Sequence, residues 1–393
     1  MRMRLRALGV AVVLTAVTTT AAASGVSGLR TEDLPGPNDP CDSNILVPYV
    51  AAGDGVPFGD KDVDGDEGVG PGEERYTERL TKMLVEDNFP YCLYNVSQGD
   101  TTSTDDYSTE DVQGFTQKSW AHNLRPRLVT LQIGRENSDI VAHISTCMTF
   151  IKNHQFIEAN ACALAVLGNE NAWDDLNDDL ADILGEYQTQ MDGNPRMVVA
   201  TLGYYNPYPS ATDVATKIPE FCTKLVDTIP TCTIRWVMLP PVLVIMDQIT
   251  KRMNRTVEGV VKRFQTSSQG HFFFVNPYEK FEDHCMKMEV DVKTKVYHPT
   301  NTVDSHDSKK DFGCSDPWIE SDGTDGNIPP WHYLPPAING VLVFTTQTTS
   351  GMGAYPNADG HECLAELIYE ADNGWGSLKN MLDVPEPPEE PCS

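Results

Sequence analysis

The chain has 393 residues, 40% of them hydrophobic, so it is long and apolar enough to bury the core of one large domain. Its formal charge is -28, from 57 acidic and 29 basic residues. This negative charge repels phosphate, and we therefore expect neither nucleic acid nor an anionic membrane surface as a partner. The same charge favours solubility and a cationic ligand or metal.

The N-terminus has the three parts of an export signal. Three arginines lie among the first six residues, and the apolar run that follows, up to Val17, is too short to span a bilayer. Small residues then lead to a cleavage position after Ala23. We therefore expect a signal peptide over residues 1–23 and a secreted or periplasmic protein. No later segment holds about 18 uninterrupted apolar residues, so we expect no transmembrane helix.

Composition divides the rest of the chain into an exposed arm (24–43), a central domain (44–373) and a tail rich in Pro and Glu (374–393). In the domain, short apolar runs typical of strands cover residues 45–51, 127–133, 197–205, 271–275 and 340–346. Helical patterns alternate with them at residues 74–86, 138–152, 173–191 and much of 241–265. This alternation predicts one α/β domain with a largely parallel sheet. Ligands of such sheets bind at the carboxyl ends of the strands.

The segment DKDVDGDEG at residues 60–68 has acidic residues at alternate positions, as at the start of an EF-hand calcium loop. The twelfth residue counted from Asp60 is Pro71, where that loop needs a bidentate glutamate. A solvated acidic loop and a weak calcium site both remain open. The calcium ligands would be Asp60, Asp62, Asp64 and Asp66.

Ten cysteines in an exported chain indicate disulfides rather than a zinc site, because the sequence has no C-x-x-C and no H-x-x-x-H pattern. Sequence spacing suggests three local pairs: Cys147 with Cys162, Cys222 with Cys232, and Cys285 with Cys314. The chain also has two Asn-x-Ser/Thr patterns, at Asn95 and Asn254, which matter only in a eukaryotic secretory pathway.

Several sequence blocks, taken together and in order, resemble the SGNH hydrolases, also called GDSL-type lipases and esterases, over most of residues 44–370. The resemblance implies a three-layer αβα sandwich with a mainly parallel sheet, the flavodoxin-like fold of that family. The blocks that carry it are YVAAGDG (49–55), NVSQGDTT (95–102), LVTLQIGRENSDIVAHISTC (128–147), MVVATLGYYNPYP (197–209), FVNPYEKFEDHC (274–285), CSDPWI (314–319) and AYPNADGHECLAELI (354–368).

In that family a serine attacks an ester carbonyl, and a histidine oriented by an aspartate takes its proton. Carried onto this sequence, the nucleophile position is Gly55, the base position is Tyr355 and the orienting position is Met352. Glycine has no hydroxyl, and tyrosine, with an unperturbed pKa of about 10, is a poor base near neutral pH. The resemblance therefore implies a catalytically degenerate member, a pseudoenzyme.

The oxyanion-binding positions are partly retained. The glycine of the second block is Gly99, and the asparagine position of the third block is Glu136, or Asn137 if the register slips by one residue. The cleft would then hold Asp54, Asp100, Glu136 and Tyr355. Close carboxylates raise one another's pKa and can bind cations or sugar hydroxyls, although these acids could also be solvated rim residues.

Three functions remain open from the sequence. The first is a secreted protein of this fold that binds an ester, glycan or other small ligand without hydrolysing it. The second is an active ester hydrolase with a relocated nucleophile and base, for which Ser350 and His361 are the candidates. The third is a non-enzymatic interaction protein whose acidic loop binds calcium.

Overall fold

The computed structural model describes a domain that starts at Val47 and ends at Leu382. Residues 1–46 and 383–393, which hold the predicted signal peptide, the arm and the end of the tail, lie outside the described residues. The described residues are 47–54, 75–87, 89, 91–97, 104–109, 111–112, 115–134, 147, 150, 155–208, 210–216, 239–282, 284, 288–291, 297–299, 309–312, 319–321, 354–356 and 358–382.

Five parallel strands form the central sheet in the order β2-β1-β5-β6-β7. Numbered along the chain, this order is 2-1-3-4-5, which is the flavodoxin-like arrangement of a doubly wound sheet. The parallel sheet predicted from the sequence is therefore confirmed. The strands are β1 (Val47–Gly53), β2 (Tyr91–Asn95), β5 (Leu128–Gln132), β6 (Val198–Leu202) and β7 (Phe272–Val275).

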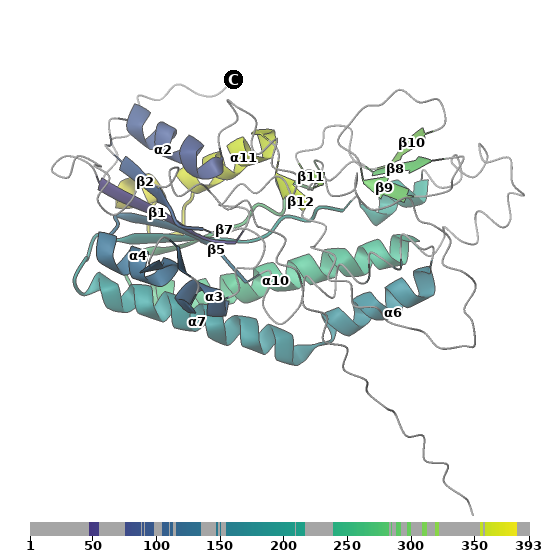
Figure 1. Ribbon diagram of the computed structural model, residues 1–393, viewed down its shortest axis with the longest axis horizontal. Coiled ribbons are helices and arrows are strands. Elements are labelled where there is room, and N and C mark those ends of the chain that lie inside the picture. The colour runs from purple at the N-terminus through teal and green to yellow at the C-terminus, as the bar shows by residue number, and fades with distance from the viewer. Residues whose placement is uncertain are drawn as a thin grey trace, which may run out of the picture.

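Helices cover both faces of the sheet and make three layers (Figure 1). One face carries α2 (Tyr76–Glu86) and α11 (Ala358–Tyr369), which also pack on each other. The other face carries α4 (Gln117–Leu124), α7 (Glu170–Met191) and α10 (Leu239–Ser267). The predicted αβα sandwich is therefore confirmed. In the described part of the chain, no helix is both long enough and apolar enough to cross a membrane.

The interior strand β1 shows why the sheet strands are apolar throughout. Tyr49 and Ala51 lie in the core under α2 and α11, whereas Val50 and Ala52 lie in the core under α4, α7 and α10. All four side chains are fully buried. Because successive strand residues point to opposite faces, a strand covered on both sides needs a continuous apolar run instead of an alternating one.

A second core lies beyond the sheet, where α6 (Phe156–Leu167) packs on the N-terminal half of α10 (Figure 1). The predicted disulfide between Cys147 and Cys162 is present here, with Cα atoms 5.4 Å apart. Cys92 is also disulfide-bonded, and Cys363 is a free, buried thiol. The other two predicted pairs, Cys222 with Cys232 and Cys285 with Cys314, lie outside the described residues.

The remaining elements are short, and β10-β8-β9, β11-β12 and β3-β4 form three small antiparallel sheets. Their bounds are α3 (Thr104–Thr109), β3 (Asp111–Val112), β4 (Phe115–Thr116), β8 (Met288–Asp291), β9 (Tyr297–Pro299), β10 (Lys309–Phe312), β11 (Ile319–Ser321), β12 (Ala354–Pro356) and α12 (Leu378–Met381). Leu378 and Leu382 are fully buried against the sheet, so packing places residues 374–382 with the domain, beyond the boundary at residue 373 expected from composition.

Candidate functional site

The carboxyl edge of the sheet is where this fold binds ligands. Of the residues predicted to form the site, the structure describes Asp54, His361 and the backbone of Tyr355. The roles predicted for the others stay predictions, because they lie outside the described residues: Gly55, Gly99, Asp100, Glu136, Asn137, Ser350, Met352, Asp60, Asp62, Asp64 and Asp66.

The end of β1 is a turn that only glycine permits. Gly53 has a φ of 132°, and a Cβ atom at this position would lie 1.9 Å from the carbonyl oxygen of Gln132. The next residue, Asp54, donates its backbone N–H to that same oxygen at 2.8 Å. The close approach of β1 to β5 therefore fixes the backbone directly before residue 55.

A buried glutamine holds this turn from the helical layer. Gln117, in the first turn of α4, accepts a hydrogen bond from Gly53 N–H at 2.8 Å and donates one to Gly53 C=O at 3.2 Å. A primary amide carries both a donor and an acceptor, so one side chain satisfies both backbone groups of Gly53. The turn is therefore held by α4 as well as by the neighbouring strand.

The carboxylate of Asp54 is 1% exposed and accepts a hydrogen bond from the Tyr204 phenol at 2.8 Å. Tyr204 is 6% exposed and lies just beyond the end of β6. A carboxylate is buried at acceptable free energy only when donors compensate for the lost water. The contact thus joins the ends of two strands through a buried acid and a phenol.

Tyr204 is itself held by a second buried amide. Asn254 on α10 accepts a hydrogen bond from Tyr204 N–H at 2.6 Å and donates one to Tyr204 C=O at 2.7 Å. Gln132 adds a hydrogen bond from its Nε2 to the Gly203 carbonyl at 2.9 Å. Asn254 is 5% exposed, so its Asn-x-Thr pattern does not present an accessible glycan acceptor in the folded chain.

Two buried polar oxygens near the carboxyl ends of β5 and β6 make no hydrogen bond within the described structure. They are Oε1 of Gln132 and Oγ1 of Thr201. Gln132 lies on β5 between the ends of β1 and β6, and its side chain is fully buried. Its free oxygen is an acceptor that a small hydrogen-bond donor could fill.

His361 has a structural contact. It is 2% exposed on α11, and its Nδ1 accepts a hydrogen bond from the backbone N–H of Tyr76, the first residue of α2, at 3.3 Å. An ion pair between Arg79 and Glu362, at 2.7 Å, links the same two helices.

Burial raises the pKa of the Tyr76 phenol well above its ordinary value. The side chain of Thr130 lowers this pKa, whereas the negative charge of Asp54 raises it further.

Tyr355 lies in β12, where it pairs with Glu320 of the antiparallel strand β11. Within the described part of the chain, no group of three or more His, Cys, Asp or Glu side chains is arranged to hold a metal ion. The predicted calcium loop lies outside that part and stays a prediction.

The strand order, with Asp54 directly after β1 and His361 on the last long helix, is the one that the resemblance predicts. The chain therefore has the flavodoxin-like αβα fold that the resemblance to the SGNH hydrolases implies. No protein-family model matches the sequence, and no curated protein matches it.

Solved structures with a similar fold include three lipases. A phospholipase A1 from Streptomyces albidoflavus NA297 is 13% identical and is matched over 82% of this chain and 98% of its own, with a TM-score of 0.42. An extracellular lipase from Streptomyces rimosus is 13% identical and is matched over 83% of this chain and 100% of its own, with a TM-score of 0.40. A GDSL-like lipase from Parabacteroides merdae is 9% identical and is matched over 86% of this chain and 96% of its own, with a TM-score of 0.36. Likenesses this distant bear on neither the activity nor the ligand of this chain.

Sequence reasoning missed the residues that hold Asp54 in place, namely Gln117, Gln132, Tyr204 and Asn254. Gln132 gave a usable signal, because it is a polar residue inside the otherwise apolar run 127–133. Asn254 and Gln117 gave no such signal in the sequence, because each lies in a helix whose polar residues are mostly solvated.

Proposed function

We propose that the chain is a secreted protein of the SGNH-hydrolase fold that no longer hydrolyses esters and instead binds a small ligand at the carboxyl edge of its sheet. The observation that carries this proposal is the glycine that follows Asp54. The β1 turn is held by β5 and by Gln117 as a nucleophile turn would need to be. Residue 55, however, has no side chain with which to form an acyl-enzyme.

The environment of His361 supports the loss of chemistry. A general base must reach the proton that it abstracts within about 3 Å, directly or through one water. His361 is 2% exposed, and its Nδ1 is used as an acceptor by the Tyr76 amide. To act as a relocated base, this imidazole would have to give up a contact between α2 and α11.

The chemistry of the buried edge favours a ligand that donates hydrogen bonds. Asp54 contributes a carboxylate, and Gln132 contributes an amide oxygen without a partner in the described structure. Both are acceptors, whereas ester hydrolysis needs donors around a developing oxyanion. A sugar hydroxyl or an amine therefore suits this edge better than an ester carbonyl does.

Hydrolysis of p-nitrophenyl acetate tests the proposal. We expect the purified wild-type protein to match the buffer rate. We expect the triple variant Gly55→Ser, Met352→Asp, Tyr355→His to exceed wild type by about a hundredfold or more, which is the range of an assembled nucleophile and base. Circular dichroism of both proteins serves as the folding control.

Two outcomes would contradict the proposal. Wild-type turnover that disappears in Ser350→Ala would identify an active hydrolase with a relocated nucleophile. A melting temperature that rises with calcium, in a protein inert to esters and to sugar or amine ligands, would favour the interaction protein with a calcium loop.

A further inference from the structure

A groove of about 580 Å³ lies between α4 and α7. We name it the α4–α7 groove, and its lining includes Phe115, Lys118, Asn123, Glu186 and Gln190. Its volume is within the range of small-molecule sites, which is about 300 to 1,000 Å³. The groove is therefore large enough for a ligand of a few sugar rings or a comparable size.

An aromatic ring forms one wall of the groove. Phe115 in β4 is 39% exposed, and it contacts Trp120 edge to face with ring centroids 5.5 Å apart. Trp120 is 3% exposed and belongs to the core of the domain. Phe115 is therefore anchored on its inner side while it presents apolar surface outward, as a platform for the C–H face of a ring would.

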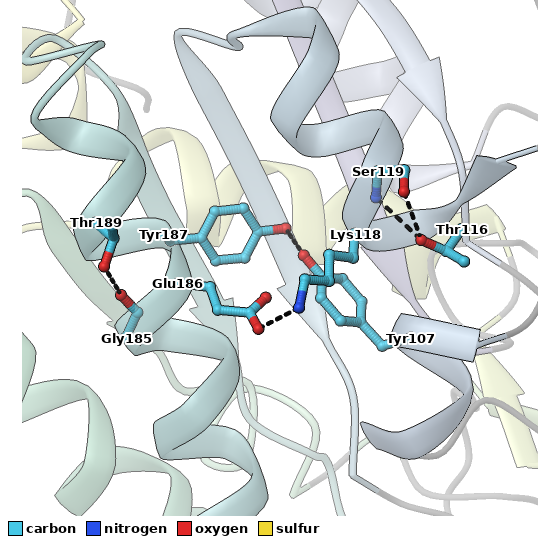
Figure 2. A network of polar contacts seen from close by, with 8 residues as sticks. All are labelled: Tyr107, Thr116, Lys118, Ser119, Gly185, Glu186, Tyr187 and Thr189. Carbon is cyan, nitrogen blue, oxygen red and sulfur yellow. Dashed lines mark hydrogen bonds and ion pairs between the residues drawn. The ribbon is translucent and has the colours of Figure 1, made fainter.

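The hydroxyl and amide side chains of the groove differ in their contacts. The two hydroxyls that line the groove are used internally: Ser119 accepts a hydrogen bond from Thr116 at 3.0 Å, and Thr189 donates to the Gly185 carbonyl at 2.9 Å (Figure 2). The amides of Asn123 and Gln190 make no hydrogen bond within the described structure. Each primary amide offers two donors and an acceptor, which is the mixed capacity that neighbouring hydroxyl groups require.

The charges of the groove are paired across it. Lys118 on α4 donates to Oε1 of Glu186 on α7, and Figure 2 shows the two side chains facing each other between the helices. The other oxygen of Glu186 is buried and has no hydrogen-bond partner in the described part of the chain. An unsatisfied buried acceptor is unfavourable, and the contact with Lys118 satisfies only one of the two carboxylate oxygens.

We propose that the α4–α7 groove binds a neutral oligosaccharide. A sugar ring presents an apolar C–H face to Phe115 and hydroxyl groups to the amides of Asn123 and Gln190. The paired charges of Lys118 and Glu186 leave no net charge to select an ionic ligand. This site shares no residue with the carboxyl edge, so the inference does not depend on the proposed function.

The test is a titration of the full-length mature protein with cellohexaose, xylohexaose and chitohexaose, followed by calorimetry and by amide NMR shifts. We expect one of these sugars to bind with a Kd of about 1 mM, because an open groove buries little of its ligand. Phe115→Ala and Gln190→Ala are each expected to weaken binding by about tenfold or more. Trp375→Ala removes an aromatic residue that is 56% exposed outside the groove and is expected to leave binding unchanged.

The proposal is overturned if none of the three sugars binds, or if binding persists in both groove variants. Asn123→Ala keeps the test valid if Phe115→Ala loses its fold, because the Asn123 side chain is exposed and its removal is expected to leave the fold intact. Asp54→Asn separates this site from the carboxyl edge. Binding that Asp54→Asn abolishes and the groove variants retain would assign the sugar to the edge instead.

Discussion

Buried amide side chains hold the ends of β1 and β6 where the hydrogen bonds of the sheet stop. Gln117 satisfies both backbone groups of Gly53, and Asn254 satisfies both of Tyr204. One amide can do this because it is at once a donor and an acceptor. These contacts hold the Asp54 carboxylate beside the Tyr204 phenol. None of the residues that do this was predicted to be catalytic.

The glycine at the end of β1 provides the sharpest prediction at this scale. Gly53→Ala would place a Cβ 1.9 Å from a carbonyl oxygen at a φ of 132°, and we expect the free energy of unfolding to fall by more than about 3 kcal/mol. Gly259→Ala is the matched control: a Cβ there meets nothing within 4 Å on the exposed side of α10, and we expect a gain of up to about 1 kcal/mol. Urea unfolding measures both. Equal effects would mean that β1 can move away from β5.

At the scale of elements, α6 and the N-terminal half of α10 form a core that the sheet does not reach. Arg252 on α10 joins this region to α7. Its guanidinium donates to the Leu167 carbonyl at 2.7 Å and to Glu170 at 2.5 Å, and it lies 5.0 Å from the centre of the Trp173 ring. These contacts span the end of α6 and the start of α7, so one side chain links the two helices.

The disulfide of this region should contribute measurably to stability. Cys147 and Cys162 close a loop with a sequence separation of 15. Replacing both by alanine is expected to lower the free energy of unfolding by about 3 kcal/mol, because the unfolded chain regains the entropy of that loop. Leu164→Ala, on the same helix and 50% exposed, is the control and should change stability by less than about 0.5 kcal/mol. A double variant as stable as wild type in urea would contradict the prediction.

For the whole molecule, buried acids that stay protonated set the alkaline limit of stability. Burial raises the pKa of the Tyr49, Tyr76, Tyr107 and Tyr187 phenols well above the ordinary value. Burial, reinforced by the charge of Glu366, raises the pKa of the Cys363 thiol to about 11. An unfolded chain loses these protons from about pH 9 for cysteine and pH 10 for tyrosine. Above these values the folded state binds more protons than the unfolded state.

Stability is therefore expected to be constant with respect to these groups at neutral pH and to fall as the pH rises from about 9 to 11. Each group contributes up to about 1.4 kcal/mol per pH unit in the range where only the unfolded chain ionises. Urea unfolding at stepped pH measures the slope, and Cys363→Ala should make it shallower between about pH 9 and 10. A free energy of unfolding that stays constant over this range would show that the phenols and the thiol ionise in the folded state as readily as in the unfolded chain.

Local patterns in the sequence were enough for four of the five strands of the main sheet and for the two longest helices, whereas β2 matches none of the predicted runs. The runs at residues 127–133 and 197–205 became β5 and β6, and the helical patterns at 173–191 and 241–265 became α7 and most of α10. Such elements are predictable because the period of the apolar residues is set by the geometry of a single strand or helix. The disulfide between Cys147 and Cys162 was predictable for a related reason, since its cysteines are near in sequence.

The sequence by itself determined the α/β class, the order of the blocks and the absence of a serine at position 55. Only the tertiary structure decided which side chains meet at the carboxyl edge. Asp54 and Tyr204 are 150 residues apart, and Gln117 is 64 residues from Gly53. Nothing in the local pattern links these pairs, because their contact depends on the parallel order of the strands and on the position of α4 and α10 against the sheet.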